Sequence, residues 1–149
     1  MKNKGFTLIE MMLTIAIILV LLAIGVPLYF VMKGNNGVNV AEKIVLADIK
    51  RARSTAASQG SATVNLTLAV SGGTSVKITD GGGNLVWQET LPYRATVATD
   101  WGNGLVTFQQ NGVANIGGPA NGIVTVSQQN ATITRQIKIV TFTGGILEQ

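Results

Sequence analysis

The sequence contains no cysteine and no histidine among its 149 residues, and only 12% of its residues are charged. Without these two side chains the chain cannot build zinc fingers, iron–sulfur or haem-thiolate sites, histidine-based triads or thiol nucleophiles. The charged fraction is about half of the roughly 25% usual in soluble proteins, so either much of the chain avoids water or its polar surface is neutral. The length fits one domain with an appendage, and we expect no cofactor.

The basic character of the chain is confined to its first third. The formal net charge is +4, of which Lys2 and Lys4 supply +2 and residues 33–53 supply +3, offset by Glu10. Residues 54–149 have no net charge. A nucleic-acid partner would need basic residues gathered on the folded domain, and the charge distribution does not favour this.

Residues 6–32 form a long apolar run with one ionisable side chain, Glu10. A helix of about 20 apolar residues crosses about 30 Å of hydrocarbon, so this run can span a membrane. A secretory signal peptide would have an apolar core of only about 7 to 15 residues. Lys2 and Lys4 favour a cytoplasmic N-terminus, although Lys33 weakens the asymmetry. We expect everything after about residue 32 to be exported.

Glu10 is the informative residue of this run. A carboxylate inside a bilayer costs several kcal/mol unless it is neutralised or paired, which makes it a candidate functional residue. The alternative is that Glu10, near the start of the run, lies among the headgroups and is hydrated. The surrounding string, KGFTLIEMMLTIAIILVLLAIGVPLY, favours the functional interpretation.

This string resembles the class III signal of type IV pilins and type II secretion pseudopilins. The resemblance implies that a leader, residues 1–5, is cut after Gly5 by prepilin peptidase, and that Phe6 becomes the N-methylated first residue. Residues 6–32 would be the transmembrane segment and later the filament core. There the Glu10 carboxylate needs a partner, and the Phe6 α-amino group of a neighbouring subunit would supply one and set axial register. Further implied partners are other pilins or pseudopilins, the inner-membrane assembly platform, and lipid before assembly.

Gly25 and Pro27 lie late in the apolar run. Proline removes a helical hydrogen bond, and glycine weakens a helix by about 1 kcal/mol relative to alanine. Membrane helices tolerate both residues. Pilin relatives place a helix-breaking proline here, so we favour a helix break that lets this region unwind in filaments.

Residues 33–60 are expected to form an amphipathic helical stem. The string GNNG at residues 34–37 predicts a local break, after which the helix resumes and Gly60 stops it. The cations near its end, Lys50, Arg51 and Arg53, are interpreted as capping and solvated residues. The apolar stripe comprises Val38, Ala41, Val45, Ile49, Ala52 and Ala56.

Residues 61–149 alternate with period two between turn signals, which predicts an exported β domain. We expect an α+β fold in which a long N-terminal helix, half transmembrane and half amphipathic, packs on an antiparallel β-sheet. The strings TFQQNGVANIGG, GIVTVS and TRQIKIVTFTGG are similar to the H-type pseudopilin and FimT-like minor pilin group, whose domain is a β-sandwich-like pair of sheets. Strands are expected at residues 62–70, 76–78, 85–91, 94–99, 105–109, 122–127 and 132–142, the last two as a hairpin.

The resemblance implies a structural subunit and no enzyme: a minor pilin or pseudopilin that helps to initiate a filament or occupies its tip. The alternatives are a FimT-like minor pilin that binds DNA during uptake, or a major pilin. DNA-binding relatives use a Gly-Arg-rich tail, whereas residues 143–149 here contain no arginine, so Arg135 and Lys138 are weak nucleic-acid candidates. The chain has no cysteine and cannot form the disulfide-bounded loop of typical major pilins, which favours a minor subunit.

Other side chains with chemical potential have simpler explanations. The acids Asp80, Glu89 and Asp100 lie in or near turns without catalytic spacing, and we interpret them as solvated. Trp87 and Trp101 are interpreted as core residues. The expected location is the inner membrane as a single-pass protein, with a cytoplasmic N-terminus and a periplasmic or extracellular domain, and the filament after assembly.

Overall fold

A computed structural model of the chain describes residues 5–70, 73–117, 121–141 and 145–148. Its elements are one helix, a 3-10 turn and short and long strands: α1 (Leu8–Gln59), β1 (Ser61–Val70), β2 (Gly73–Asp80), β3 (Leu85–Thr90), η1 (Pro92–Arg94), β4 (Thr96–Thr99), β5 (Leu105–Gln109), β6 (Ala114–Asn115), β7 (Asn121–Ser127), β8 (Arg135–Val140) and β9 (Gly145–Glu148). Several expected features lie outside the described residues: most of the proposed leader, the turn at residues 71–72, the Gly118-Pro119 break, the end of the last expected strand at residue 142, and residues 143, 144 and 149 of the tail.

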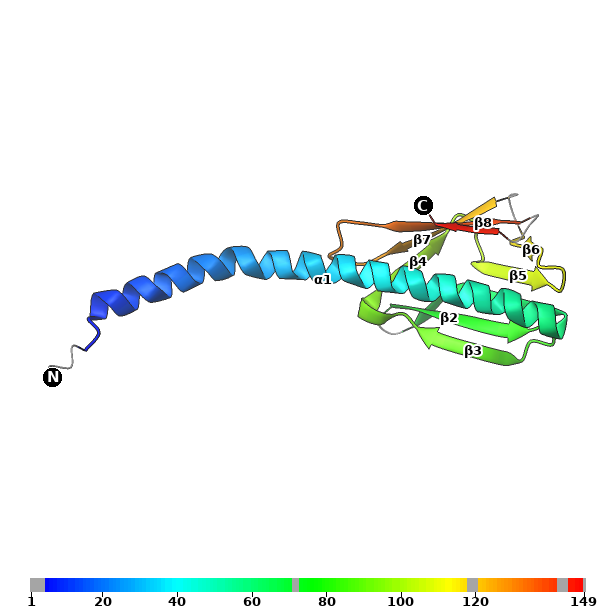
Figure 1. Ribbon diagram of the computed structural model, residues 1–149, viewed down its shortest axis with the longest axis horizontal. Helices are drawn as coiled ribbons and strands as arrows, with labels where there is room; N and C mark the ends of the chain where they lie inside the picture. The colour runs from blue at the N-terminus through cyan, green and yellow to red at the C-terminus, as the bar shows by residue number, and fades with distance from the viewer. Residues whose placement is uncertain (1–4, 71–72, 118–120, 142–144, 149) are drawn as a thin grey trace.

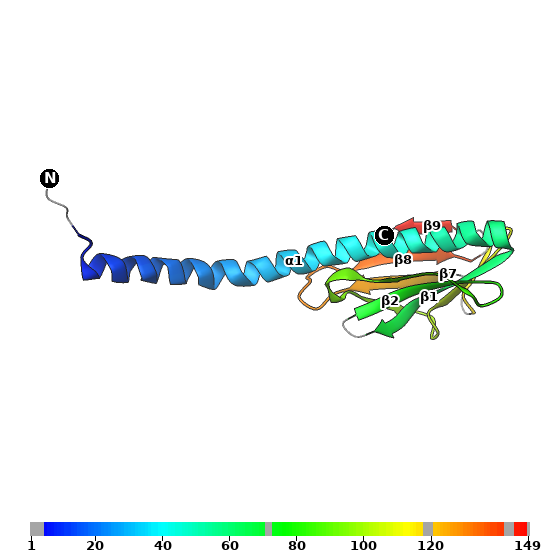
Figure 2. The same cartoon turned by 90° about the horizontal axis from the view of Figure 1, so that it is seen from below.

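The strands form two antiparallel sheets, which confirms the α+β expectation. One sheet has the order β3-β2-β1-β5-β6 and the other the order β4-β7-β8-β9. The second half of α1 contacts β1, β2 and β5 of the first sheet and β7 and β8 of the second (Figure 1). The first half projects away from both sheets in the two views (Figures 1 and 2). The fold therefore places a bare helix at one end and a β domain at the other.

The helix is continuous, so the expected break at residues 34–37 is wrong. A Cβ atom at Gly34 would lie 2.7 Å from the backbone of Asn130, between β7 and β8. Next to it, the Asn35 Oδ1 accepts a hydrogen bond of 2.9 Å from the Thr132 amide. Glycine therefore serves here to let α1 approach a loop closely, because only a residue without a side chain fits.

The helix also passes through Gly25 and Pro27 without interruption. A Cβ atom at Gly25 would meet nothing within 4 Å, so no tertiary contact demands glycine there. Unwinding of this region in a filament stays a prediction about the assembled state.

The expected apolar stripe is confirmed as the buried face of α1. All six of its residues have 0% exposure, and they pack with Phe108, Ile78 and Ile137 of the two sheets. The helix ends at Gln59, and Gly60 adopts a φ of 91°, a conformation that favours glycine, as expected for the stop. The spacing of apolar residues therefore predicted the buried face of the helix, and the glycine predicted its end.

The strand pattern is largely confirmed, with three corrections. β4 begins at Thr96 and not at residue 94, because Pro92–Arg94 turns the chain first. The expected final hairpin exists, but its second strand is the shorter β8, which pairs Val126 with Arg135 and Asn121 with Val140. Two strands were missed: β6 has two residues, and β9 pairs with β8 in a tail that has no alternating pattern.

Candidate assembly site at the exposed helix

The helix begins with a reciprocal cap between Thr7 and Glu10. The Thr7 amide and hydroxyl donate hydrogen bonds of 2.8 and 2.9 Å to Oε2 of Glu10. The Glu10 amide in turn donates to the Thr7 hydroxyl at 3.4 Å. This arrangement satisfies backbone groups that the first turn leaves unpaired. Sequence reasoning missed the role of Thr7, although the spacing Thr-x-x-Glu before an apolar run signals it.

The cap leaves part of the Glu10 carboxylate available. Both bonds use Oε2, and Oε1 accepts no hydrogen bond from the part of the chain that the structure describes. The cap also holds the side chain toward the helix N-terminus. An ammonium group approaching from another chain could therefore meet Oε1 while the cap remains intact.

Apart from the half-buried Val31, the large apolar side chains between residues 6 and 32 are exposed in the isolated chain. A window of 18 residues in this helix has a mean hydropathy of 2.8, and none of it is buried. By length and composition this is a helix that could cross a membrane. A continuous apolar surface of this kind marks contact with lipid or with other protein.

Gly5 and Phe6 precede the cap and are exposed. They are not helical, and a Cβ atom at Gly5 would meet nothing within 4 Å. The peptide bond between them is therefore accessible.

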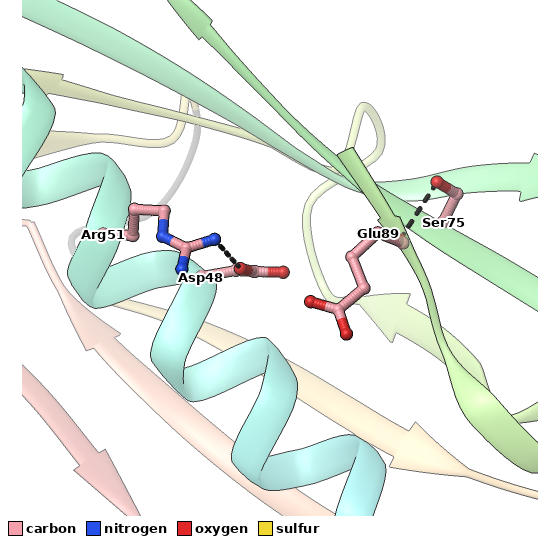
Figure 3. Close-up of polar contacts among 4 residues, drawn as sticks. All are labelled: Asp48, Arg51, Ser75 and Glu89. Atoms are coloured by element: carbon pink, nitrogen blue, oxygen red, sulfur yellow. Dashed lines mark hydrogen bonds and ion pairs between the residues drawn. The ribbon is translucent and has the colours of Figure 1, made fainter. Parts of the chain in front are cut away.

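A second polar cluster lies where α1 passes the edge strand β3 (Figure 3). Arg51 lies 3.7 Å from Asp48 as an ion pair, and its guanidinium stacks over Trp87 at 4.1 Å from the ring centre. The interpretation of Arg51 as a capping residue was therefore wrong. Trp87 is 39% exposed and is not a core residue, whereas Trp101 is 4% exposed and is core as expected.

Asp48 is buried, with a side chain only 3% exposed. Its Oδ2 has no hydrogen-bond partner among the described residues, and it faces the Glu89 side chain on β3 (Figure 3). Burial, and then repulsion by Glu89, raise the pKa of Asp48 to about 6, against smaller lowering effects of Arg51 and Trp87. Sequence reasoning missed this residue, because one aspartate beside an apolar stripe carries no motif.

Two of the three acids interpreted as solvated have structural roles. Asp80 accepts hydrogen bonds from the amides of Gly82 and Asn84 and so closes the turn between β2 and β3. Asp100 accepts a hydrogen bond of 2.9 Å from the Ile123 amide on β7. Within the described ranges, no group of three acidic side chains could hold a metal ion.

The two nucleic-acid candidates both lie on β8. Arg135 donates a hydrogen bond of 3.1 Å to Asn39 and lies 3.6 Å from Glu42, so α1 already binds its guanidinium. Lys138 is half-buried.

Comparisons with known proteins agree with this arrangement. Residues 1–26 match the family described as the prokaryotic N-terminal methylation motif. The fold is similar to a crystal structure of the type IV minor pilin FimU of Pseudomonas aeruginosa strain PAO1, with a TM-score of 0.61 and 18% identity, over 76% of this chain and 89% of that chain. The chain thus carries an N-terminal methylation motif on a fold like that of a type IV minor pilin.

A second crystal form of FimU gives a TM-score of 0.57 and 20% identity, over 74% of this chain and 90% of that chain. A comparison with curated protein sequences finds no significant match. At this identity the structural likeness establishes the fold, while the methylation motif covers the residues that we expect to be processed.

Proposed function

We propose that this pilin-like chain is a structural subunit of a type IV pilus or type II secretion pseudopilus, acting as a minor pilin or pseudopilin in filament initiation or at the tip. The observation that supports this most is the exposed apolar half of α1, joined without a break to a half that is buried in the β domain. One half can move from lipid into a helical filament core while the other keeps the domain outside.

Processing at the N-terminus would convert the membrane form into the assembling form. Residues 1–5 act as the leader, prepilin peptidase cuts between Gly5 and Phe6, and the new Phe6 amine is methylated. Cleavage removes Lys2 and Lys4, which otherwise hold the N-terminus at the cytoplasmic face. Residues 6–32 are the transmembrane and filament-core segment, residues 33–60 the stem, and residues 61–149 the exported β domain.

Glu10 would then set the axial register of the subunit. Its free Oε1 can accept a hydrogen bond from the Phe6 amine of a neighbouring subunit within the apolar core. There, an unpaired carboxylate or an unpaired ammonium group would be costly to bury. Loss of one partner of a buried pair costs about 3–5 kcal/mol, enough to exclude a subunit from a filament.

The test is incorporation of Glu10→Ala into filaments in a host that has prepilin peptidase and an assembly machine. We expect the variant to insert and to be cleaved after Gly5, as mass spectrometry of its N-terminus would show, but to be depleted from sheared filaments. Undiminished recovery in that fraction would refute the role of Glu10.

The matched control is Thr7→Ala, which removes the intrachain cap and keeps the carboxylate. If the carboxylate acts by pairing with a neighbour, Thr7→Ala should assemble far better than Glu10→Ala. Equal depletion of the two variants would mean that helix capping alone explains the effect.

The DNA-binding alternative has little structural support. Arg135 is bound to Glu42 and Asn39, and the charge of residues 54–149 is balanced. Phosphate binding needs several cations on one face.

A further inference from the structure

A cavity of about 300 Å³ lies where α1 leaves the β domain. Two successive turns of α1 and one residue of η1 line it: Tyr29, Met32, Lys33, Asn36 and Tyr93. Its walls are thus two tyrosine rings and a methionine, with one ammonium group and one amide.

Tyr93 is held in place by an unusual backbone. It has a φ of 58°, and the next residue, Arg94, has a φ of 57°. A residue with a side chain enters this region at a cost of about 1–3 kcal/mol, so the surroundings must impose it. Part of the constraint is Gly37 of α1, where a Cβ atom would lie 3.0 Å from the Cβ of Tyr93. The missing side chain at residue 37 therefore allows the tyrosine to lie on the helix.

The position of the cavity along α1 coincides with the expected membrane surface. About 20 helical residues cross about 30 Å of hydrocarbon. If the span starts at Ile9, beside the Glu10 cap, it ends at Tyr29. Tyrosine is enriched at this boundary because its ring is apolar and its hydroxyl is wet.

The charge near the cavity is positive. Lys33 and Arg94 are both exposed, and within the described residues no acidic side chain lies within ion-pair distance of either. Arg94 faces an adjacent shallow hollow that it shares with Gln128 and Gln129. A cation just above the hydrocarbon is placed to meet lipid phosphate, and its alkyl stem can lie along the apolar wall.

We propose that this cavity binds the headgroup of an anionic phospholipid in the periplasmic leaflet before the subunit enters a filament. Lys33 contacts the phosphate, the rings of Tyr29 and Tyr93 flank the glycerol and upper acyl carbons, and Asn36 bonds to headgroup oxygens. The inference rests on the proposed function, since it requires the membrane stage of a pilin-like subunit. The bound lipid would hold the β domain against the bilayer at a defined height, and extraction into a filament would have to release it.

The experiment uses the full chain in nanodiscs of phosphatidylcholine with and without phosphatidylglycerol, followed by native mass spectrometry of the lipids that remain bound. We expect selective retention of phosphatidylglycerol by the unmodified chain. Lys33→Gln should weaken its retention about fivefold, which corresponds to about 1 kcal/mol for one cation near a charged surface. Tyr93→Asn should weaken it as well, and asparagine tolerates the left-handed backbone, so this variant keeps the fold.

Lys43→Gln is the matched control. It makes the same charge change on the same helix, at an exposed residue about 15 Å farther from the membrane. We expect it to retain phosphatidylglycerol as the unmodified chain does. Equal losses in Lys33→Gln and Lys43→Gln, or no preference for phosphatidylglycerol, would overturn the site while leaving the proposed function intact. Failure of the unmodified chain to insert into the nanodisc bilayer would instead refute the membrane stage of the proposed function, and the lipid site with it.

Discussion

Replacing the buried Asp48 by asparagine should stabilise the β domain at neutral pH. The carboxylate is almost fully buried, and one of its oxygens has no hydrogen-bond partner among the described residues. The asparagine side chain has nearly the same shape as the aspartate but carries no charge to bury. The variant loses the ion pair with Arg51, but that guanidinium is half-exposed, and such pairs contribute at most about 1 kcal/mol.

The magnitude follows from the pKa of Asp48 in the two states. The ordinary value of 3.8 applies to the unfolded chain, and the folded value is about 6. This difference corresponds to about 3 kcal/mol of lost stability when the group is ionised in both states. We treat this figure as an upper value, because water screens the charge interaction with the half-exposed Arg51 guanidinium. We therefore expect Asp48→Asn to raise the free energy of unfolding by about 1–3 kcal/mol.

The pH dependence has a defined sign. Between pH 3.8 and about 6 the folded state binds a proton that the unfolded state does not, so stability rises as pH falls through this window. Below 3.8 the carboxyl group is protonated in both states and its penalty is absent. The advantage of Asp48→Asn should therefore be largest above pH 6 and should disappear below pH 3.8.

The assay is urea denaturation of the full chain in detergent micelles, followed by tryptophan fluorescence at pH values above 6 and below 3.8. Asp80→Asn is the control, because hydrogen bonds from Asn84 lower the pKa of Asp80 and give the opposite sign. That variant should lose stability at neutral pH, with a loss that shrinks in acid. A variant Asp48→Asn that is less stable than the unmodified chain above pH 6, or whose gain is independent of pH, would refute this reasoning.

Three further predictions test the fold. Gly34→Ala should destabilise the domain by about 1–3 kcal/mol in the same denaturation assay, because its Cβ atom would lie 2.7 Å from the Asn130 backbone. Its control is Gly25→Ala, which makes the same change in open space and should be neutral or stabilising. Phe108→Ala should cost about 3–5 kcal/mol, since the ring is completely buried; a loss below about 1 kcal/mol would contradict its place in the core. Thr7→Ala should speed amide exchange in the first helical turn, and unchanged exchange would show that the cap is not needed there.

The position of each main element was predictable from local pattern. The stem helix follows from apolar residues at spacings of three and four, and its end follows from Gly60. Glu10 was predictable as a candidate because a single acid stands out in an apolar run. Thr7 could have been found by the same route, since its partner lies three residues away.

The errors have a common physical origin, which is contact between residues far apart in the chain. Gly34 and Gly37 were interpreted as helix breakers because glycine has a low helix propensity. In the structure, both face a neighbouring segment that leaves little room for a side chain. Trp87 was interpreted as a core residue because aromatic residues in a β domain are usually buried. It lies instead on the edge strand β3, beneath the Arg51 guanidinium. The short strand β9 depends entirely on pairing with β8.

The sequence by itself determined the division into an apolar helix, an amphipathic stem and a β domain, because these follow from periodicity along one segment. It also singled out the one acid of the apolar run. Only the tertiary structure decided that α1 is continuous, that Asp48 is buried opposite Glu89, and that Tyr93 closes a cavity against Tyr29 and Lys33. Those features arise from side chains that lie far apart along the chain and meet only when the helix packs on the sheets, and no local pattern encodes such distances.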